Sequence, residues 1–294
     1  SDLGAPYLTD YAVRVSTSWS RRTVHAATLD YKLSRNDRLS LALQYSLYYD
    51  AVNNRTLTFL VNRVAPGNFA TTFTHGFAGA GEVRLESAAL KWSDRLFMPT
   101  LTWRHDGPIW KSDVGVGHSR STRKRLDFSN GHFNSATARR QGVTVSFDDI
   151  FYLRPRVITV TDGATGAPVD PFDIRNFYIN TTNSNQLDTV NAERSLFGNI
   201  RRSFYGSIPL TLKAGVDVRH SMRDIRQINP TFTFVGADGR NTTATTTAGS
   251  DDGAVQVFDR SFSQRTSPFG FPSIQWLSNE QLFDLYLAHP AWFT

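Results

Sequence analysis

The chain of 294 residues is 40% hydrophobic and 20% charged, carries a net charge of +6 and contains no cysteine. The absence of cysteine excludes disulfide frameworks, thiolate metal sites and cysteine nucleophiles. The length suits one large all-β domain or two small ones. No stretch approaches the ~20 consecutive apolar residues of a membrane helix, so any membrane span is expected in strands.

The chain begins with segments in which apolar and polar residues alternate. This period of two predicts β-strands, and the first apolar row, from Tyr11 to Trp19, has an aromatic residue at both ends. Two further segments, Ala27 to Leu33 and Arg38 to Tyr49, are separated by the polar tetrapeptide Ser34 to Asp37. The sequence therefore predicts an antiparallel hairpin with a tight polar turn.

The segment Arg38 to Tyr49 carries the clearest pattern. From Leu39 onwards every second residue is leucine or tyrosine, and the residues between them are mostly small or polar. A strand of about 12 residues, at roughly 3.3 Å each, is longer than the usual 5–6 and covers the ~9–11 tilted residues of a membrane-spanning strand. The pattern predicts the wall of a β-barrel with lipid outside and water inside.

A second hairpin follows the same plan. Phe97 to Trp103 and Trp110 to Val116 alternate on either side of the turn His105 to Pro108, and Val143 to Phe147 continues the pattern. In Leu210 to Val218 the intervening positions include lysine and aspartate. Such charges are costly in a dry core but stable in a wet lumen.

Long connecting segments separate these strands. We expect loops over Val52 to Gly81, Arg120 to Arg140 and Thr161 to Val190. Short turns on one rim and long loops on the other are typical of outer-membrane barrels. If both short turns lie on one rim, the number of strands between them is constrained, and we expect one more strand than the clear alternation provides. Arg55 to Val61 is the candidate for this strand. Ser278 to Leu287 carries a helix start signal and predicts a short helix within a loop.

The sequence offers little for catalysis. It contains no metalloprotease, nucleophile-elbow, phosphate-loop or dinucleotide motif, so we predict a non-enzymatic protein without a cofactor. The adjacent pair Asp148-Asp149 is interpreted as a solvated turn, and the seven histidines show no metal-ligand spacing. Tryptophans at strand ends are interpreted as a membrane-interface girdle in preference to a sugar platform.

The positive charge raises the question of nucleic acid. The arginines are scattered over strand ends and loops without a nucleic-acid-binding motif, so we predict no nucleic-acid partner. The densest basic cluster lies between Arg120 and Arg125. Guanidinium groups bind phosphate and carboxylate in a bidentate way, so Arg123 and Arg125 are candidates for contact with lipopolysaccharide phosphates or an anionic ligand.

With its long alternating strand, its Trp103 to Trp110 hairpin and its glycine-containing strand Leu210 to Arg219, the chain resembles the barrel region of a TonB-dependent outer-membrane receptor. The resemblance covers most of residues 1–294 and implies an antiparallel up-and-down transmembrane β-barrel domain with long extracellular loops. A complete barrel of this family has about 22 strands around a plugged lumen, so this chain resembles an interior slice. The family's plug and its short N-terminal box that contacts the energy-coupling protein have no counterpart here. The start at Ser1 also lacks a targeting-peptide pattern.

The resemblance implies energised uptake of a bulky scarce ligand, such as a metal chelate, cobalamin or an oligosaccharide. The implied location is the outer membrane of a Gram-negative-type bacterium, with membrane lipid and lipopolysaccharide around the wall. A TonB-type energy-coupling protein would act through a plug outside this chain. Position in long loops makes six residues candidates for ligand contact. These are Arg123, Arg125, Phe128, His132, Phe269 and Trp276.

Two alternatives stay open. One is another outer-membrane barrel, such as a passive porin or an autotransporter translocator, which shares the alternation but lacks a plug. The other is a soluble secreted all-β protein, carbohydrate-binding or adhesive, whose apolar faces pack on one another. The length of the Arg38 to Tyr49 strand favours a barrel wall over a sandwich.

Overall fold

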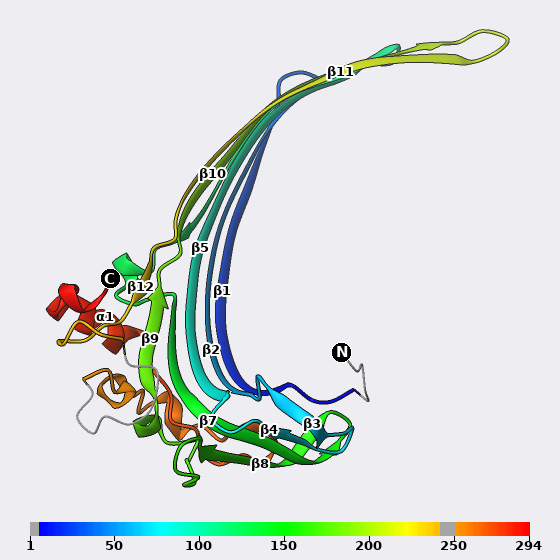
Figure 1. Ribbon diagram of the computed structural model, residues 1–294. Helices are drawn as coiled ribbons and strands as arrows, with labels where there is room; N and C mark the ends of the chain where they lie inside the picture. Colours follow the sequence, from blue (N-terminus) through cyan, green and yellow to red (C-terminus); the bar gives the residue numbers. More distant parts are fainter. Residues whose placement is uncertain (1–5, 242–250) are drawn as a thin grey trace.

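A computed structural model of the chain describes residues 6–241 and 251–294, and these residues form one twelve-stranded antiparallel sheet (Figure 1). The predicted all-β antiparallel class is confirmed. The sheet is open: within the described residues, the edge strands β1 (Asp10–Lys32) and β11 (Leu210–Ile228) each pair with a single neighbour. No helix in this part of the chain is long and apolar enough to cross a membrane.

Six long strands make the main wall. Their spatial order is β1, β2, β5, β6, β10 and β11. The four not yet defined are β2 (Asp37–Leu60), β5 (Gly81–Asp106), β6 (Trp110–Arg125) and β10 (Gln186–Phe204). Figure 1 shows the wall as an arc with hairpin tips at one end and the other elements gathered at the opposite end. We call these the hairpin end and the loop end.

The hairpin end includes the two short turns that the sequence predicts. In the β1–β2 turn, the Ser34 hydroxyl oxygen accepts the backbone N–H groups of Asn36 and Asp37, each at 3.1 Å. These hydrogen bonds satisfy backbone N–H groups at the point where the pairing of the two strands ends. They therefore favour serine at this position. The β5–β6 and β10–β11 turns lie at the same end, so long connections are left to the loop end.

The prediction of a separate crossing at Arg55 to Val61 is wrong. β2 continues without a register shift from Asp37 to Leu60, and the chain returns to the second turn through β5, which begins at Gly81 and includes the predicted segment Phe97 to Trp103, so no further crossing is needed. β2 extends because its last residues are buried, with Leu57 and Phe59 fully inaccessible. The predicted loop at Arg120 to Arg140 is also shorter, because β6 runs to Arg125 and the next strand begins at Ser135.

The wall divides at the loop end. The second half of β5 pairs with β6, whereas its first half pairs with β7 (Ser135–Phe151). β7 in turn pairs with the remaining loop-end strands, directly or through one of them. These are β3 (Val64–Phe69), β4 (Thr74–Gly76), β8 (Arg154–Asp162), β9 (Tyr178–Asn183) and β12 (Thr231–Thr233).

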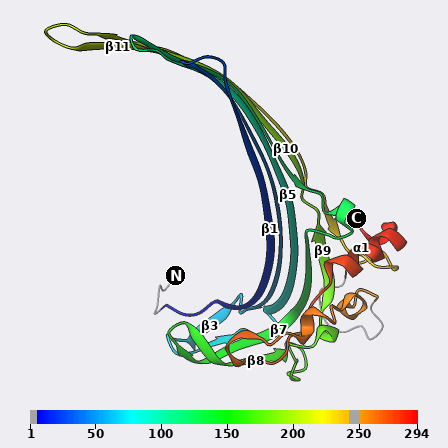
Figure 2. The same cartoon turned by 180° about the vertical axis from the view of Figure 1, so that it is seen from behind.

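The C-terminal segment, residues 251–294, packs on the convex side of the sheet, as both views show (Figures 1 and 2). It contains the predicted helix, α1 (Asn279–Ala288), whose N-cap Ser278 accepts the backbone N–H of Gln281 at 3.1 Å. The short 3₁₀ helices of the described chain are η1 (Phe128–Asn130), η2 (Ile174–Asn176), η3 (Ala254–Val257), η4 (Phe262–Gln264), η5 (Pro268–Gly270) and η6 (Pro290–Trp292). The core is therefore concentrated at the loop end.

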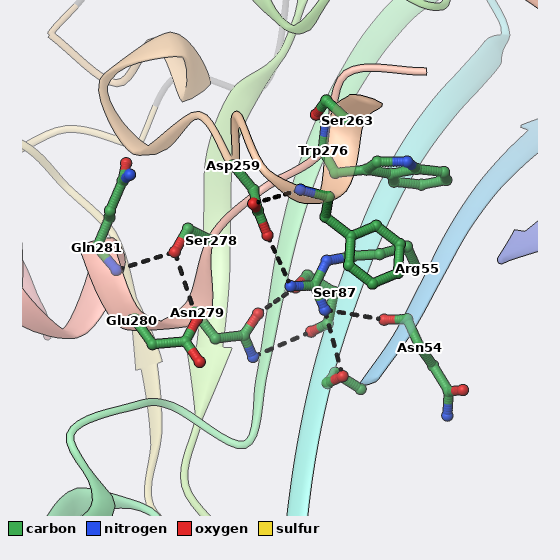
Figure 3. A network of polar contacts seen from close by, with 12 residues as sticks. Asn54, Arg55, Ser87, Asp259, Ser263, Trp276, Ser278, Asn279, Glu280 and Gln281 are labelled. Atoms are coloured by element: carbon green, nitrogen blue, oxygen red, sulfur yellow. Dashed lines mark hydrogen bonds and ion pairs between the residues drawn. The ribbon is translucent and has the colours of Figure 1, made fainter. Parts of the chain in front are cut away.

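A buried polar network fastens this segment to the wall (Figure 3). Arg55 of β2 donates from Nη2 to Asp259 Oδ2 at 3.1 Å, and its guanidinium lies 4.7 Å from the centre of the Phe262 ring. Ser87 of β5 hydrogen-bonds the Asn279 side chain, which also donates to the Phe133 carbonyl at 2.9 Å. The Arg55 side chain is only 2% exposed, so its charge depends on Asp259.

The substitution Asp259→Asn should destabilise the loop end by about 3 kcal/mol, because it leaves a buried guanidinium without its counter-charge. Urea unfolding followed by tryptophan fluorescence measures this, since Trp276 is buried in the same core. The matched control is Asp149→Asn, which removes the carboxylate of an exposed ion pair with Arg156 and should cost less than about 1 kcal/mol. Equal effects of the two substitutions would contradict the anchoring role.

The wall has two chemically distinct faces. One continuous row of paired residues crosses all six strands on the convex face: Leu29, Leu41, Leu101, Val116, Leu196 and Val218. Most of these side chains are exposed, up to 67% for Leu29. On each strand, the convex-face residues at every second position continue this row on both sides. The row and these neighbouring residues together form what we call the apolar band. The concave face carries the intervening polar residues, so the alternation predicted from sequence is preserved across the wall.

Candidate functional site

A groove on the concave polar face is the best candidate for a ligand site. Its volume is about 400 Å³. The register aligns Arg22, Tyr48, Asp94 and Arg123 from four neighbouring strands in one row beneath it. Ser46, Arg95 and Leu96 also line what we call the candidate ligand groove. It is open to the concave side and combines charge, hydroxyl groups and one aromatic ring.

A bidentate ion pair organises this groove. Arg123 donates from Nε to Asp94 Oδ1 at 3.0 Å and from Nη2 to Asp94 Oδ2 at 2.7 Å. The neighbouring Arg22 has no ion-pair partner among the described residues, so it adds a free positive charge. A fixed guanidinium, a free guanidinium and a tyrosine suit an anionic or hydroxyl-rich ligand, because arginine binds carboxylate and phosphate in a bidentate way.

A second polar groove, of about 300 Å³, lies nearer the hairpin end of the same face. Asn199 donates to Asp113 Oδ2 at 3.0 Å across it, and Lys111 is paired with Asp106. Arg104, Arg201 and Lys213 also line this groove, so cationic groups outnumber carboxylates there. Cationic side chains therefore outnumber carboxylates in both grooves of the concave face.

The described residues contain no cluster of three or more histidine and acidic side chains arranged to hold a metal ion. The chemistry of the grooves is that of ion pairing and hydrogen bonding. It suits reversible binding of a polar ligand.

The structure separates the six residues that sequence position made candidates. Arg123 lies in the candidate ligand groove, and Arg125 lies on the same face nearer the loop end, donating from Nε to the Asn185 carbonyl. Phe269 is 70% exposed, with the Arg154 guanidinium 5.3 Å from its ring centre. These three do not meet in one pocket, and a role for any of them in ligand contact stays a prediction.

The other three candidates belong to the core that the C-terminal segment forms with the sheet. Trp276 is 2% exposed, and His132 is fully buried. Phe128 packs against the rings of Phe133, Phe283 and Tyr286, with ring centres 5.1–5.8 Å apart. In this structure these side chains contribute to packing of the segment, and their surfaces do not face the groove.

The sequence interpretation missed Arg22, Tyr48 and Asp94. Arg22 and Asp94 do not stand out in their own segments, because each is a polar residue at a polar position of an alternating strand. They become a site only when the register aligns the strands, and that register depends on pairing between residues far apart in the chain. Tyr48, the large residue in the otherwise small polar row of its strand, was the available signal.

The chain was also compared with known proteins. No family model and no curated protein matches it. Its function is therefore inferred from the geometry of the sheet and its faces.

His132 should make the loop end sensitive to acid. Burial lowers the pKa of its imidazole below the usual value and the Lys91 charge acts in the same direction, while a 2.9 Å hydrogen bond between Nδ1 and the Phe133 carbonyl partly opposes them. The folded state therefore favours neutral histidine. The contribution of neutral His132 to the free energy of unfolding is complete above the unfolded-state pKa of about 6.5. It is lost as the pH falls below that value.

The variant His132→Gln should accordingly lose less unfolding free energy than the parent protein between pH 7.5 and pH 5. Urea unfolding at several pH values measures the slope. The exposed His220 provides the control, since His220→Gln should leave the slope unchanged. A parent-like slope in His132→Gln would contradict the assignment.

Proposed function

We propose that this chain forms part of the wall of a TonB-dependent outer-membrane receptor that imports a bulky scarce ligand, such as a metal chelate, cobalamin or an oligosaccharide. The observation that carries the proposal is the apolar band across six strands, backed by a polar concave face. A contiguous apolar surface larger than a few hundred Å² marks an interaction surface. Lipid on one side and a wet lumen on the other account for both faces.

The slant of the band supports a tilted barrel. On the loop-end side the band ends at Tyr49 in β2, at Phe97 in β5 and at Val116 in β6, each closer to the hairpin end than the last. Neighbouring strands differ by four residues in the position of this border, so the border crosses the wall obliquely. Barrel strands tilt by about 35–45°, so a flat membrane plane crosses them in this way.

Aromatic residues border the band on both sides. On the loop-end side Trp19 packs edge-on against Tyr49, with ring centres 5.4 Å apart. On the hairpin side Tyr31, Trp103 and Trp110 share the apolar face. Aromatic side chains prefer the membrane–water interface, so two borders of this kind support a membrane-spanning band.

The two open edges are part of the proposal. β1 and β11 have 23 and 19 residues and leave their outer backbone N–H and C=O groups without strand partners among the described residues. Within lipid each such group costs several kcal/mol. In the proposed barrel, further strands therefore pair with both edges. They close the sheet around a lumen on the concave face.

The loop end favours a receptor over a passive barrel. The long strands continue past the band, as β2 does from Tyr49 to Leu60, and carry a folded region with its own core. In the proposed mechanism, this region and the candidate ligand groove hold ligand on the polar face. A plug outside this chain is pulled by the energy-coupling protein, and the lower affinity of the pulled state releases the ligand. No covalent chemistry is involved.

Two neighbouring substitutions in β2 test the orientation of the wall. Leu43→Lys places a charge in the apolar band and should cost about 2–4 kcal/mol in the membrane, which reduces assembly in the outer membrane. Gln44→Lys, one residue along on the polar face, is the matched control and should assemble normally. Membrane fractionation with quantitative immunoblotting measures both. Equal assembly of the two variants would contradict a lipid-facing band and favour a soluble β-protein.

Energised uptake separates the receptor from a passive barrel. Cells expressing the protein should accumulate one of a panel of ferric chelates, cobalamin and maltodextrins, and accumulation should stop when the energy-coupling protein is deleted. Tyr48→Ala combined with Arg22→Gln should weaken binding of that ligand at least tenfold, whereas Arg223→Gln should leave it unchanged. Uptake that persists without the energy-coupling protein would identify a passive channel.

A further inference from the structure

Four arginines follow the loop-end border of the apolar band. They are Arg21 of β1, Arg95 of β5, Arg120 of β6 and Arg194 of β10, and all four share the convex face with the band. All four side chains belong to exposed residues. We call them the arginine belt.

The register places the belt along the slant of the band. Arg21 pairs with Tyr49, and Arg95 pairs with Leu47, two residues closer to the hairpin end. Arg120 pairs with Phe97, and Arg194 with His118, and each step is again two residues closer. The arginines therefore lie at one depth relative to a membrane plane that crosses the tilted strands.

None of the four belt arginines has an ion-pair partner within the described residues. Beyond the belt, towards the loop end, Lys91 pairs with Glu280, Lys124 with Asp188 and Arg226 with Asp224. The acidic residues thus neutralise lysines and arginines farther from the band. The guanidinium groups at the border stay available to an external anion.

A hollow on the convex face lies at the centre of the belt. Its volume is about 570 Å³, and Arg95, Arg120 and Lys124 line it together with Tyr45 and Phe97. The aromatic pair adjoins the apolar band, and Asp188 at the far wall is already paired with Lys124 at 3.0 Å. One end of the hollow is therefore apolar and the other cationic.

We propose that the arginine belt, with this hollow at its centre, binds the phosphate groups of lipid headgroups in the leaflet on the loop side. Guanidinium binds phosphate in a bidentate way, and basic residues next to a hydrophobic span attract anionic headgroups. The acyl chains continue onto the apolar band. This inference rests on the proposed function and specifies the lipid partner of its convex face.

The test uses the purified protein in a neutral detergent, with native mass spectrometry as the readout. The probes are lipid A carrying both phosphates, lipid A stripped of phosphate, and inorganic phosphate. The test variant combines Arg95→Gln, Arg120→Gln and Arg194→Gln. The control variant removes the same charge from the polar face with Lys32→Gln, Arg38→Gln and Arg223→Gln.

We expect phosphorylated lipid A to bind the parent protein and the control variant equally, and the test variant at least tenfold more weakly. The parent should also prefer phosphorylated over stripped lipid A at least tenfold, a comparison that does not depend on folding of any variant. Unchanged lipid binding in the folded test variant would overturn the proposal. So would equal binding of both lipids, or displacement of lipid A by inorganic phosphate, which would indicate a site for a free anion.

Failure of the proposed function has a different signature. A parent protein that remains in the aqueous phase when membranes are separated would refute the barrel wall itself, and the lipid site with it. A parent protein that partitions into the membrane but shows no preference for phosphorylated lipid A would refute only the arginine belt.

Discussion

The unbroken antiparallel register between β2 and β5 is the constraint on which the rest of the structure depends. It runs from the pair Asp37 and His105 to the pair Leu60 and Glu82 without a bulge. Because side chains alternate with a period of two, a slip of one residue anywhere along this ladder would exchange the residues of the concave and convex faces. The apolar band, the groove and the C-terminal anchor therefore share one alignment.

The alternating segments and their turns could be predicted from sequence because their information is local. The alternation from Leu39 to Tyr49 alone indicates which side chains share a face, and Ser34 hydrogen-bonds within the turn in which it lies. The loop end could not be predicted in this way. Val143 and Phe147 of β7 are fully buried in a core to which residues more than 100 positions later in the chain, such as Trp276, also belong. The alternation of Val143 to Phe147 predicts the strand, but it does not indicate which residues cover that strand.

The candidate site shows the same division. Position in a polar loop suggested Phe128, His132 and Trp276, yet burial assigns these side chains to the core beneath the C-terminal segment. The basic run from Arg120 to Arg125 looked like one cluster. Alternation within β6 divides it, with Arg120 on the convex face and Arg123 on the concave one. This division was predictable from the period of two, whereas the pairing of Arg123 with Asp94 required the register.

The two functional surfaces proposed for the wall lie back to back. Arg21 and Arg22 are neighbours on β1, as are Asp94 and Arg95 on β5, and in each pair one residue lies in the candidate ligand groove and the other in the arginine belt. If headgroup phosphates hold the belt at the membrane surface, the groove on the opposite face is held at the same depth. The ligand would therefore be bound at the entrance of the lumen, level with the lipid headgroups and directly below the folded loop end. In the proposed receptor, a site at this depth would be reached from the outside without crossing the apolar band, so capture would precede any movement of a plug.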